Sequence, residues 1–296
     1  MDDSGYLMGG AAFLLMIPLV IIAMMMLGLD EHMASCTAEA AASSSVKRAA
    51  EDLKDNIPII TREVLNESAY RVINGDECPD IRENIQERLD RICSGYLNLN
   101  ASCTVNSVES SPDDPFQVEV NATIRINEGN TGHLENVSER VSVEGLPDPL
   151  PFRVLGELQH NSTTVDYGDK LSNHLNSCGV RGDLYINATG PFIIKRCPYE
   201  PYDCHGHDGV LINCLLNGYY HESHDGSCYL CRLQGRASCP HPGLETFIIP
   251  GFCASSGPVS ADHVLFTEPY EGDPVNCSGF ILYLDGGHKM KYGLIP

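Results

Sequence analysis

Cysteine and histidine residues are dense between residues 204 and 241. They form four short groups: Cys204-His205-Gly206-His207, His221-Glu222-Ser223-His224, Cys228-Tyr229-Leu230-Cys231 and Cys239-Pro240-His241. Zinc favours Cys and His ligands, and Cys-x-x-Cys is one of its common spacings. In an extracellular protein, however, neighbouring cysteines usually form disulfides. We therefore expect a structural disulfide cluster here, with a metal site as the alternative. No catalytic residue, metal ligand or cofactor is predicted.

The number of cysteines also indicates the compartment. Of thirteen, all but Cys36 lie between Cys78 and Cys277, a density typical of an oxidising, extracellular environment. Cys36 is expected to be free or to join two copies of the chain. The candidates for disulfide bonds are Cys78, Cys93, Cys103, Cys178, Cys197, Cys204, Cys214, Cys228, Cys231, Cys239, Cys253 and Cys277.

Glycosylation sequons support the same compartment, since they are more frequent than the roughly two expected by chance. Seven Asn-x-Ser/Thr sequons begin at Asn66, Asn100, Asn121, Asn136, Asn161, Asn187 and Asn276. The net charge of −21 would repel phosphate backbones, so nucleic acid is not an expected partner.

Acidic and aromatic residues of the C-terminal half allow two further interpretations. A paired-carboxylate hydrolase could draw on Glu222, Asp225, Glu245, Asp262 and Asp285. With 40 acidic residues in the chain, such sets arise readily, and we expect these acids to be solvated surface groups. Tyrosine rings could stack on sugars, but in a chain without Trp we expect them to fill the core; they are Tyr219, Tyr220 and Tyr229.

An uncharged segment of 24 residues, Tyr6–Leu29, lies near the N-terminus. As a helix it would be about 36 Å long, enough to cross a hydrocarbon core of about 30 Å. We predict a single-pass anchor with a cytoplasmic N-terminus, because the cysteines and sequons all follow it. Gly5 and Gly9 form a GxxxG spacing that lets helices approach closely, and Pro18 should kink the helix near Leu14.

An apolar stripe continues beyond the anchor. Residues recurring every three or four positions predict that the helix extends to about 60 residues, broken or bent in places, with Pro58 as one bend. The stripe consists of Val46, Ala49, Leu53, Ile57, Ile60 and Val64. A second short amphipathic helix is predicted around Ile81–Ile92.

The pattern then changes to period two. Apolar residues alternate from Phe116 to Ile126 and return from Val137 to Val143, which predicts an antiparallel hairpin. The proline-rich segment Leu146–Pro151 is expected to be an irregular connector. Beyond it we predict short strands at Leu184–Ile186, Phe247–Ile249, Val264–Phe266 and Phe280–Leu284.

A span at the start, an amphipathic helix and an antiparallel sheet together resemble type IV pilins. The segments DDSGYLMGGAAFLLMIPLVI and GLPDPLPF resemble archaeal pilin-like, membrane-anchored envelope proteins, especially those of methanogens. The resemblance covers roughly residues 1–150. It implies that the apolar half-helix lies in the membrane or in a filament core, and that the amphipathic half backs a β-sheet head.

The sequence thus predicts an α+β fold in four parts: a transmembrane anchor (1–29), a helical stalk (30–75), a pilin-like head (76–150) and a disulfide-rich, mainly-β domain (151–296). The expected function is a structural or adhesive role as a surface glycoprotein. The expected partners are the membrane and other pilin-like subunits or cell-wall glycans. A glycan-binding module and an extracellular metal-dependent hydrolase are the alternatives.

Overall fold

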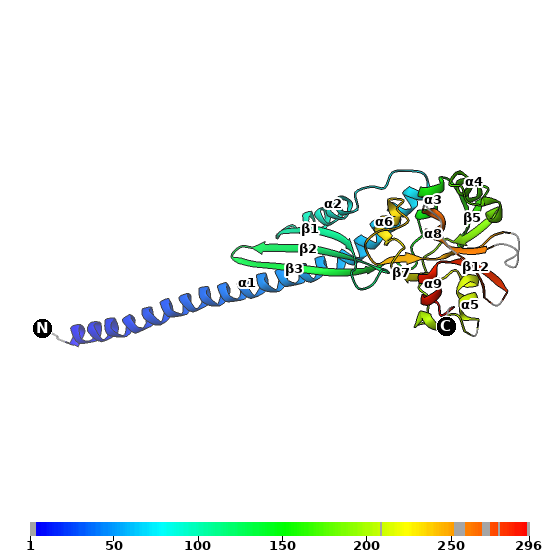
Figure 1. The fold of residues 1–296 in the computed structure, drawn as a ribbon. Helices are drawn as coiled ribbons and strands as arrows, with labels where there is room; N and C mark the ends of the chain where they lie inside the picture. Colours follow the sequence, from blue (N-terminus) through cyan, green and yellow to red (C-terminus); the bar gives the residue numbers. More distant parts are fainter. Residues whose placement is uncertain (1–3, 208, 252–257, 268–272, 278, 295–296) are drawn as a thin grey trace.

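The fold is α+β and extends along one long helix (Figure 1). The computed structural model describes residues 4–207, 209–251, 258–267, 273–277 and 279–294; the side chains of residues 4–15, 30–32, 34–35 and 258 lie outside this description. A three-stranded sheet lies along the second half of helix α1, and the C-terminal elements gather at the far end of that helix.

Helix α1 (Ser4–Ile73) contains 70 residues and is longer than the sequence predicts. It runs without a break through Pro18 and Pro58, so the predicted break is wrong, whereas a bend at Pro58 stays a prediction. Each proline removes one backbone donor, a loss that the other hydrogen bonds of a long helix can carry. Whether Pro18 changes the direction of the helix stays a prediction.

No helix in the described part of the chain has both the length and the apolar character needed to cross a membrane. The predicted anchor Tyr6–Leu29 and the contact positions Gly5 and Gly9 fall partly or wholly on residues 4–15, whose side chains lie outside the description.

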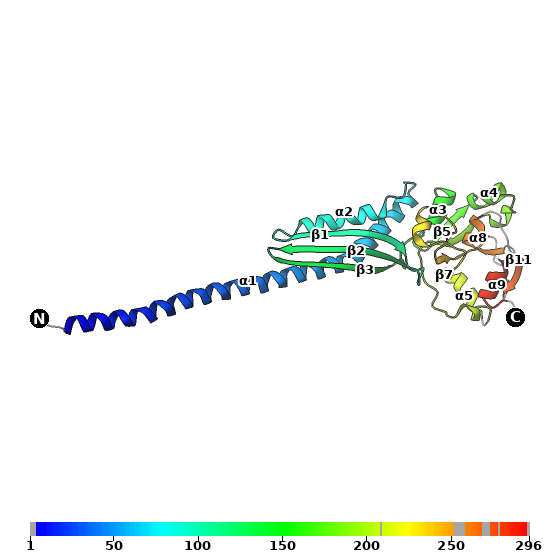
Figure 2. The same cartoon turned by 60° about the vertical axis from the view of Figure 1, so that its left-hand side comes forward.

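The second half of α1 packs on the sheet, as predicted. The sheet has the antiparallel order β1-β2-β3, formed by β1 (Asn100–Ser110), β2 (Gln117–Glu128) and β3 (Thr131–Ser142) (Figure 2). Apolar side chains from both elements form one core, which includes Leu53, Ile57, Ile60 and Val64 of α1 and Val120, Ala122, Ile124 and Ile126 of β2.

Helix α2 (Ile81–Ser94) confirms the second predicted helix. Asp80 caps it by accepting a hydrogen bond from the backbone N–H of Glu83 at 2.9 Å, which satisfies one of the unpaired donors of the first turn. Arg88 then links α2 to α1 through Glu63 and Glu67, at 3.2 and 2.5 Å.

The C-terminal region mixes short helices and strands, rather than being mainly β. The elements are α3 (Leu150–Leu155), β4 (Gln159–His160), β5 (Thr164–Gly168), α4 (Lys170–Ser177), η1 (Gly182–Tyr185), β6 (Ala188–Pro191), η2 (Tyr202–Cys204), α5 (Val210–Asn217), β7 (His221–Ser223), α6 (Tyr229–Leu233), β8 (Gly243–Glu245), β9 (Phe247–Ile248), β10 (Pro258–Ala261), α8 (Asp262–Phe266), β11 (Asp273–Cys277), β12 (Phe280–Leu284) and α9 (Gly286–Lys291). The strands form three sheets with the orders β11-β12-β10-β9, β4-β5-β6 and β7-β8.

Two of the four short strands predicted in this region are confirmed, as β9 and β12. The other two predictions are wrong: Leu184–Ile186 overlaps the 3-10 helix η1, and Val264–Phe266 lies in α8. Short apolar runs of three residues satisfy either period, so the pattern alone could not separate a strand from a helical turn.

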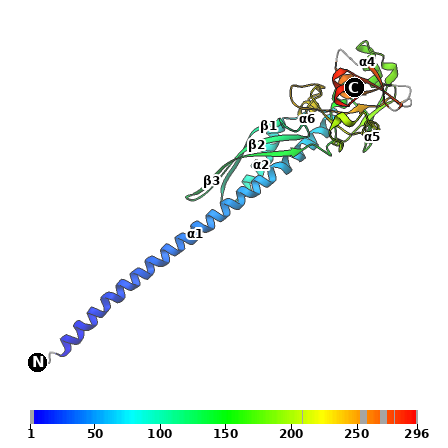
Figure 3. The ribbon, with the colours of Figure 1, turned by 60° about the horizontal axis from the view of Figure 1, so that its bottom comes forward.

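A shared core joins the stalk to the C-terminal region, which lies beyond the sheet at the end of α1 (Figure 3). It combines the last turns of α1 with β2 and with side chains from residues 194–244. Its members include Leu65, Ala69 and Val72 of α1, Phe116 and Val118 beside or in β2, and Tyr220, Tyr229, Leu233 and Leu244.

Candidate metal-binding clusters and a buried ionic core

Four side chains that are distant in sequence converge in the first cluster, which we call cluster A: Cys197, His205, Cys214 and His221. His205 follows η2, Cys214 lies in α5 and His221 begins β7. The Sγ atom of Cys197 lies 3.3 Å from the Sγ atom of Cys214 and 3.3 Å from Nε2 of His205. All four residues are buried, and their four ligand atoms lie within 4.8 Å of one another.

The electrostatics of cluster A favour a thiolate at one position. The hydrogen bond from Cys214 lowers the pKa of the Cys197 thiol to about 3 against the opposing effect of burial, and His205 and His221 add to this effect. The same hydrogen bond raises the pKa of Cys214, and burial lowers that of His221. Within the described residues, neither ring nitrogen of His221 has a hydrogen-bond partner, nor does Nδ1 of His205.

A second group of four, cluster B, consists of Cys228, Cys231, Cys239 and His241. Nδ1 of His241 lies 3.6 Å from Sγ of Cys228 and 3.9 Å from Sγ of Cys231. Cys228 is the N-cap of α6, and its backbone N–H points at Sγ of Cys239 at 3.3 Å. The hydrogen bond from Cys231 lowers the pKa of Cys228 to about 5. Cluster B therefore also provides a thiolate beside an imidazole.

Not every residue of the Cys/His-rich groups joins a cluster. Cys204, His207 and His224 are exposed and belong to neither. No disulfide bond joins two of the twelve cysteines that the structure describes, and Cys253 lies outside the described residues. The disulfide candidates therefore remain predictions. The seven sequon asparagines are half-buried or exposed, so none of them is fully buried within the chain.

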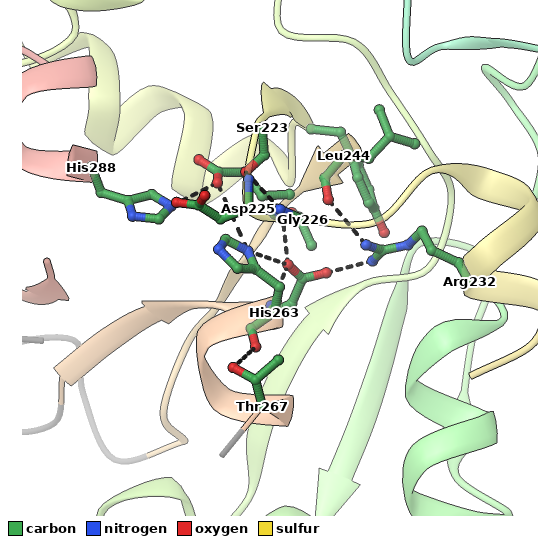
Figure 4. Close-up of polar contacts among 12 residues, drawn as sticks. Ser223, Asp225, Gly226, Arg232, Leu244, His263, Thr267 and His288 are labelled. Carbon is green, nitrogen blue, oxygen red and sulfur yellow. Dashed lines mark hydrogen bonds and ion pairs between the residues drawn. The ribbon is translucent and has the colours of Figure 1, made fainter. Parts of the chain in front are cut away.

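A buried ionic group lies beside β8. Arg232 of α6 donates hydrogen bonds to Asp148 and to Asp262 of α8. It also donates to the carbonyl of Leu244 at 3.1 Å (Figure 4). Asp262 also accepts backbone hydrogen bonds from Thr246 and His263, at 3.3 and 2.8 Å. The group joins the proline-rich connector to two helices, and the single cation of Arg232 faces two carboxylates in a buried site.

A second ionic group surrounds Glu245, which is fully buried. His288 donates from Nε2 to Glu245 at 2.8 Å, and its Nδ1 lies 2.6 Å from Asp285. Burial lowers the pKa of His288, but the bonds to Glu245 and Asp285 outweigh it and raise that pKa to about 9. The ring centroids of His263 and His288 lie 5.1 Å apart. Both side chains are drawn in Figure 4. His288 is therefore a cation held between two carboxylates.

These two groups correct part of the sequence interpretation. Glu245 and Asp262 are 0% and 1% exposed, so the prediction that they are surface acids is wrong. Each is buried because cations face it: Lys291 and His288 around Glu245, and Arg232 beside Asp262. Asp225 is exposed, as predicted.

The tyrosines fill the core, as predicted, at two of three positions. Tyr220 and Tyr229 are at most 1% exposed. The hydroxyl of Tyr220 donates to Asp148 at 2.9 Å, and that of Tyr229 donates to the carbonyl of Pro147 at 3.3 Å. Both hydroxyls therefore support the proline-rich connector. Tyr219 is half-buried.

No sequence motif singles out Asp148, Arg232, His263 or His288. A buried arginine and its carboxylates are separated by tens of residues, and only the folded chain brings them together. No protein-family model matches the chain, and neither the curated proteins nor the solved structures compared with it include a match, so the clusters are interpreted from their geometry alone.

Proposed function

We propose that this protein is a membrane-anchored, pilin-like surface protein with a structural role in a cell envelope. One observation carries the proposal: helix α1 exposes apolar side chains between Met16 and Leu29 and buries an apolar stripe against the sheet in its second half. The exposed apolar segment needs an apolar environment. The buried stripe attaches the folded three-stranded sheet to that segment.

The apolar surface is large. Eleven large apolar side chains between Met16 and Leu29 are 46% to 69% exposed: Met16, Ile17, Leu19, Val20, Ile21, Ile22, Met24, Met25, Met26, Leu27 and Leu29. Fully burying one such side chain contributes about 1.5–3 kcal/mol. A contiguous apolar patch of this kind marks a surface that binds lipid or protein. Because the residues occupy every face of the helix, surrounding lipid fits better than a one-sided partner.

The sequons support an extracellular location for the region that follows the apolar segment. All seven sequons follow the apolar segment, and their asparagines are accessible within the folded chain. The hydrolase and glycan-binding alternatives receive less support, because Glu245, Asp262, Tyr220 and Tyr229 are committed to internal contacts.

Flotation with lipid vesicles tests the proposal. The full chain, purified in detergent, is mixed with phosphatidylcholine vesicles, the detergent is removed, and the sample is centrifuged through a density gradient. We expect the chain to float with the vesicles and to stay with them after alkaline carbonate washing. Recovery of the chain as a soluble species at the bottom of the gradient would overturn the anchor. Protease added outside sealed vesicles should then digest the region beyond residue 30.

A further inference from the structure

We infer that cluster A binds one Zn²⁺ ion through Cys197, His205, Cys214 and His221 as a closed, structural site. This inference is independent of the membrane anchor, since it concerns only residues 197–221. The order of ligands along the chain is Cys-x7-His-x8-Cys-x6-His. Such a set of two thiolates and two imidazoles is one of the common ligand sets of structural zinc.

The distances fit a tetrahedral ion. With Zn–S near 2.3 Å and Zn–N near 2.0–2.1 Å, a tetrahedron separates two sulfurs by about 3.8 Å and a sulfur from a nitrogen by about 3.5 Å. The corresponding separations from Cys197 are 3.3 Å to Cys214 and 3.3 Å to His205, and no pair of ligand atoms exceeds 4.8 Å. A disulfide would require a separation of about 2.0 Å and would leave both imidazoles unused.

Burial provides the second observation. His205 and His221 are 0% exposed, and the rings of Tyr202 and Tyr292 pack against both of them. A buried polar atom without a partner costs about 1–3 kcal/mol. Both ring nitrogens of His221 are buried and have no hydrogen-bond partner among the described residues. A metal ion would give one of them a partner without adding water to an aromatic pocket.

The closed ligand set defines the role of the ion. All four positions of a tetrahedral zinc would be filled by the protein, whereas catalytic zinc keeps one position for water or substrate. The ion would fasten η2, α5 and β7, which are each three to eight residues long, to one another. Zn²⁺ would bind both sulfurs as thiolates. Because Cys197 is already a thiolate, only the thiol proton of Cys214 is released, and no oxidant is needed.

Cluster B independently supports a second zinc ion. Its order is Cys-x2-Cys-x7-Cys-x-His, and it contains the Cys-x-x-Cys spacing of many zinc sites. The backbone N–H of Cys228 that points at the sulfur of Cys239 is placed to stabilise a thiolate. Zn²⁺ would bind the three sulfurs here as thiolates and release the thiol protons that they still carry, and His241 would provide the fourth ligand.

Metal content of the full chain in detergent tests both sites. The chain is purified without exposure to oxygen, saturated with Zn²⁺, desalted and analysed by elemental mass spectrometry. We expect two zinc ions per chain. Cys214→Ser should remove the ion of cluster A alone, and Cys239→Ser that of cluster B alone. Cys204→Ser is the matched control, because it changes an exposed cysteine outside both clusters and should keep both ions.

A second measurement keeps the result independent of folding in the variants. In the unaltered chain, Cys197 and Cys214 should resist alkylation until a chelator is added, and should then react without prior reduction. Cobalt substitution should give the intense d–d absorption of a tetrahedral thiolate site. A peptide linking Cys197 to Cys214 by a disulfide, or a metal content that Cys214→Ser leaves unchanged, would overturn cluster A. The same two outcomes at Cys239 would overturn cluster B.

Discussion

Arg232 donates two hydrogen bonds to Asp148, from Nε to Oδ1 at 2.9 Å and from Nη2 to Oδ2 at 2.5 Å, and neither side chain is more than 1% exposed. Asp262 accepts a third bond from the same guanidinium. A planar fork of donors suits this arrangement better than a lysine would, because one arginine can satisfy two carboxylates in different directions. The proline-rich connector is therefore fixed by the ion pair at Asp148 as well as by the restricted backbone of its prolines.

Removing the guanidinium should destabilise the C-terminal region strongly. Arg232→Met leaves two buried carboxylates without a cation, and breaking a buried pair in this way typically costs about 3–5 kcal/mol. We expect this decrease in the free energy of unfolding to appear in urea unfolding of the full chain in detergent, monitored by tyrosine fluorescence. Arg181→Met is the control, because Arg181 pairs with Asp183 on the surface and its loss should leave the unfolding midpoint unchanged. Equal midpoints for both variants would contradict a stabilising role of Arg232.

Two adjacent isoleucines test the packing of the stalk on the sheet. Ile60 is 6% exposed and belongs to the core of α1 and β2, whereas Ile59 is 56% exposed. Ile60→Asp buries an unpaired carboxylate and should cost on the order of 3 kcal/mol. Ile59→Asp introduces the same side chain at the adjacent, exposed position of the helix and should change stability little. Thermal unfolding monitored by circular dichroism would disprove the packing if the two variants behaved alike.

His288 should make stability depend on pH in the alkaline range. Its pKa is raised to about 9 in the folded chain, compared with about 6.5 when unfolded. A raised folded-state pKa means that the contribution is fully present below pH of about 6.5 and is lost as the pH rises through about 9. His288→Gln should flatten the decline of the unfolding free energy over this window, while the exposed His224→Gln should not. An unaltered slope in His288→Gln would show that the imidazolium is absent.

Charges placed in the apolar half of α1 should prevent membrane insertion. Ile22→Asp combined with Met25→Asp adds two carboxylates one helical turn apart, at about 2.5–3.5 kcal/mol each in the middle of a bilayer. We expect this variant to lose flotation with vesicles. Ala38→Asp combined with Ala41→Asp has the same spacing at exposed positions beyond the apolar segment and should float like the parent chain. Flotation of both variants would place the membrane contact elsewhere.

Periodic segments were predictable because one pattern governs many residues. The stripe on α1 and the alternation in β2 each extend over ten residues or more, so local exceptions do not hide the period. Strand β1 was missed although it is equally long. A register shift between Val105 and Ser107 interrupts its alternation, and its sequence NASCTVNSVES is mostly polar. A bulge of this kind removes the signal while preserving the strand.

The clusters were predictable only in composition. The sequence indicated a region rich in Cys and His, but grouped the residues by their neighbours along the chain. The structure instead combines His205 with Cys197, outside the segment singled out, and leaves Cys204 exposed. Which of two adjacent side chains points inward depends on η2 and α5, elements too short to give a period. The choice between disulfide and metal needs distances that only the folded chain provides.

Between Leu29 and Ser45, which hydrogen-bonds Glu128 at the end of β2, helix α1 continues for 15 residues (30–44). No described side chain of this stretch is buried, and at 1.5 Å per residue its length is about 22 Å. In an anchored chain it acts as a spacer that sets the clearance between the lipid surface and the tip of the β2–β3 hairpin. Because each residue also turns the helix by about 100°, deleting seven residues would lower the head by about 10 Å while leaving it facing nearly the same direction. Deleting five would lower it by about 8 Å and rotate it by about 140° about the helix axis.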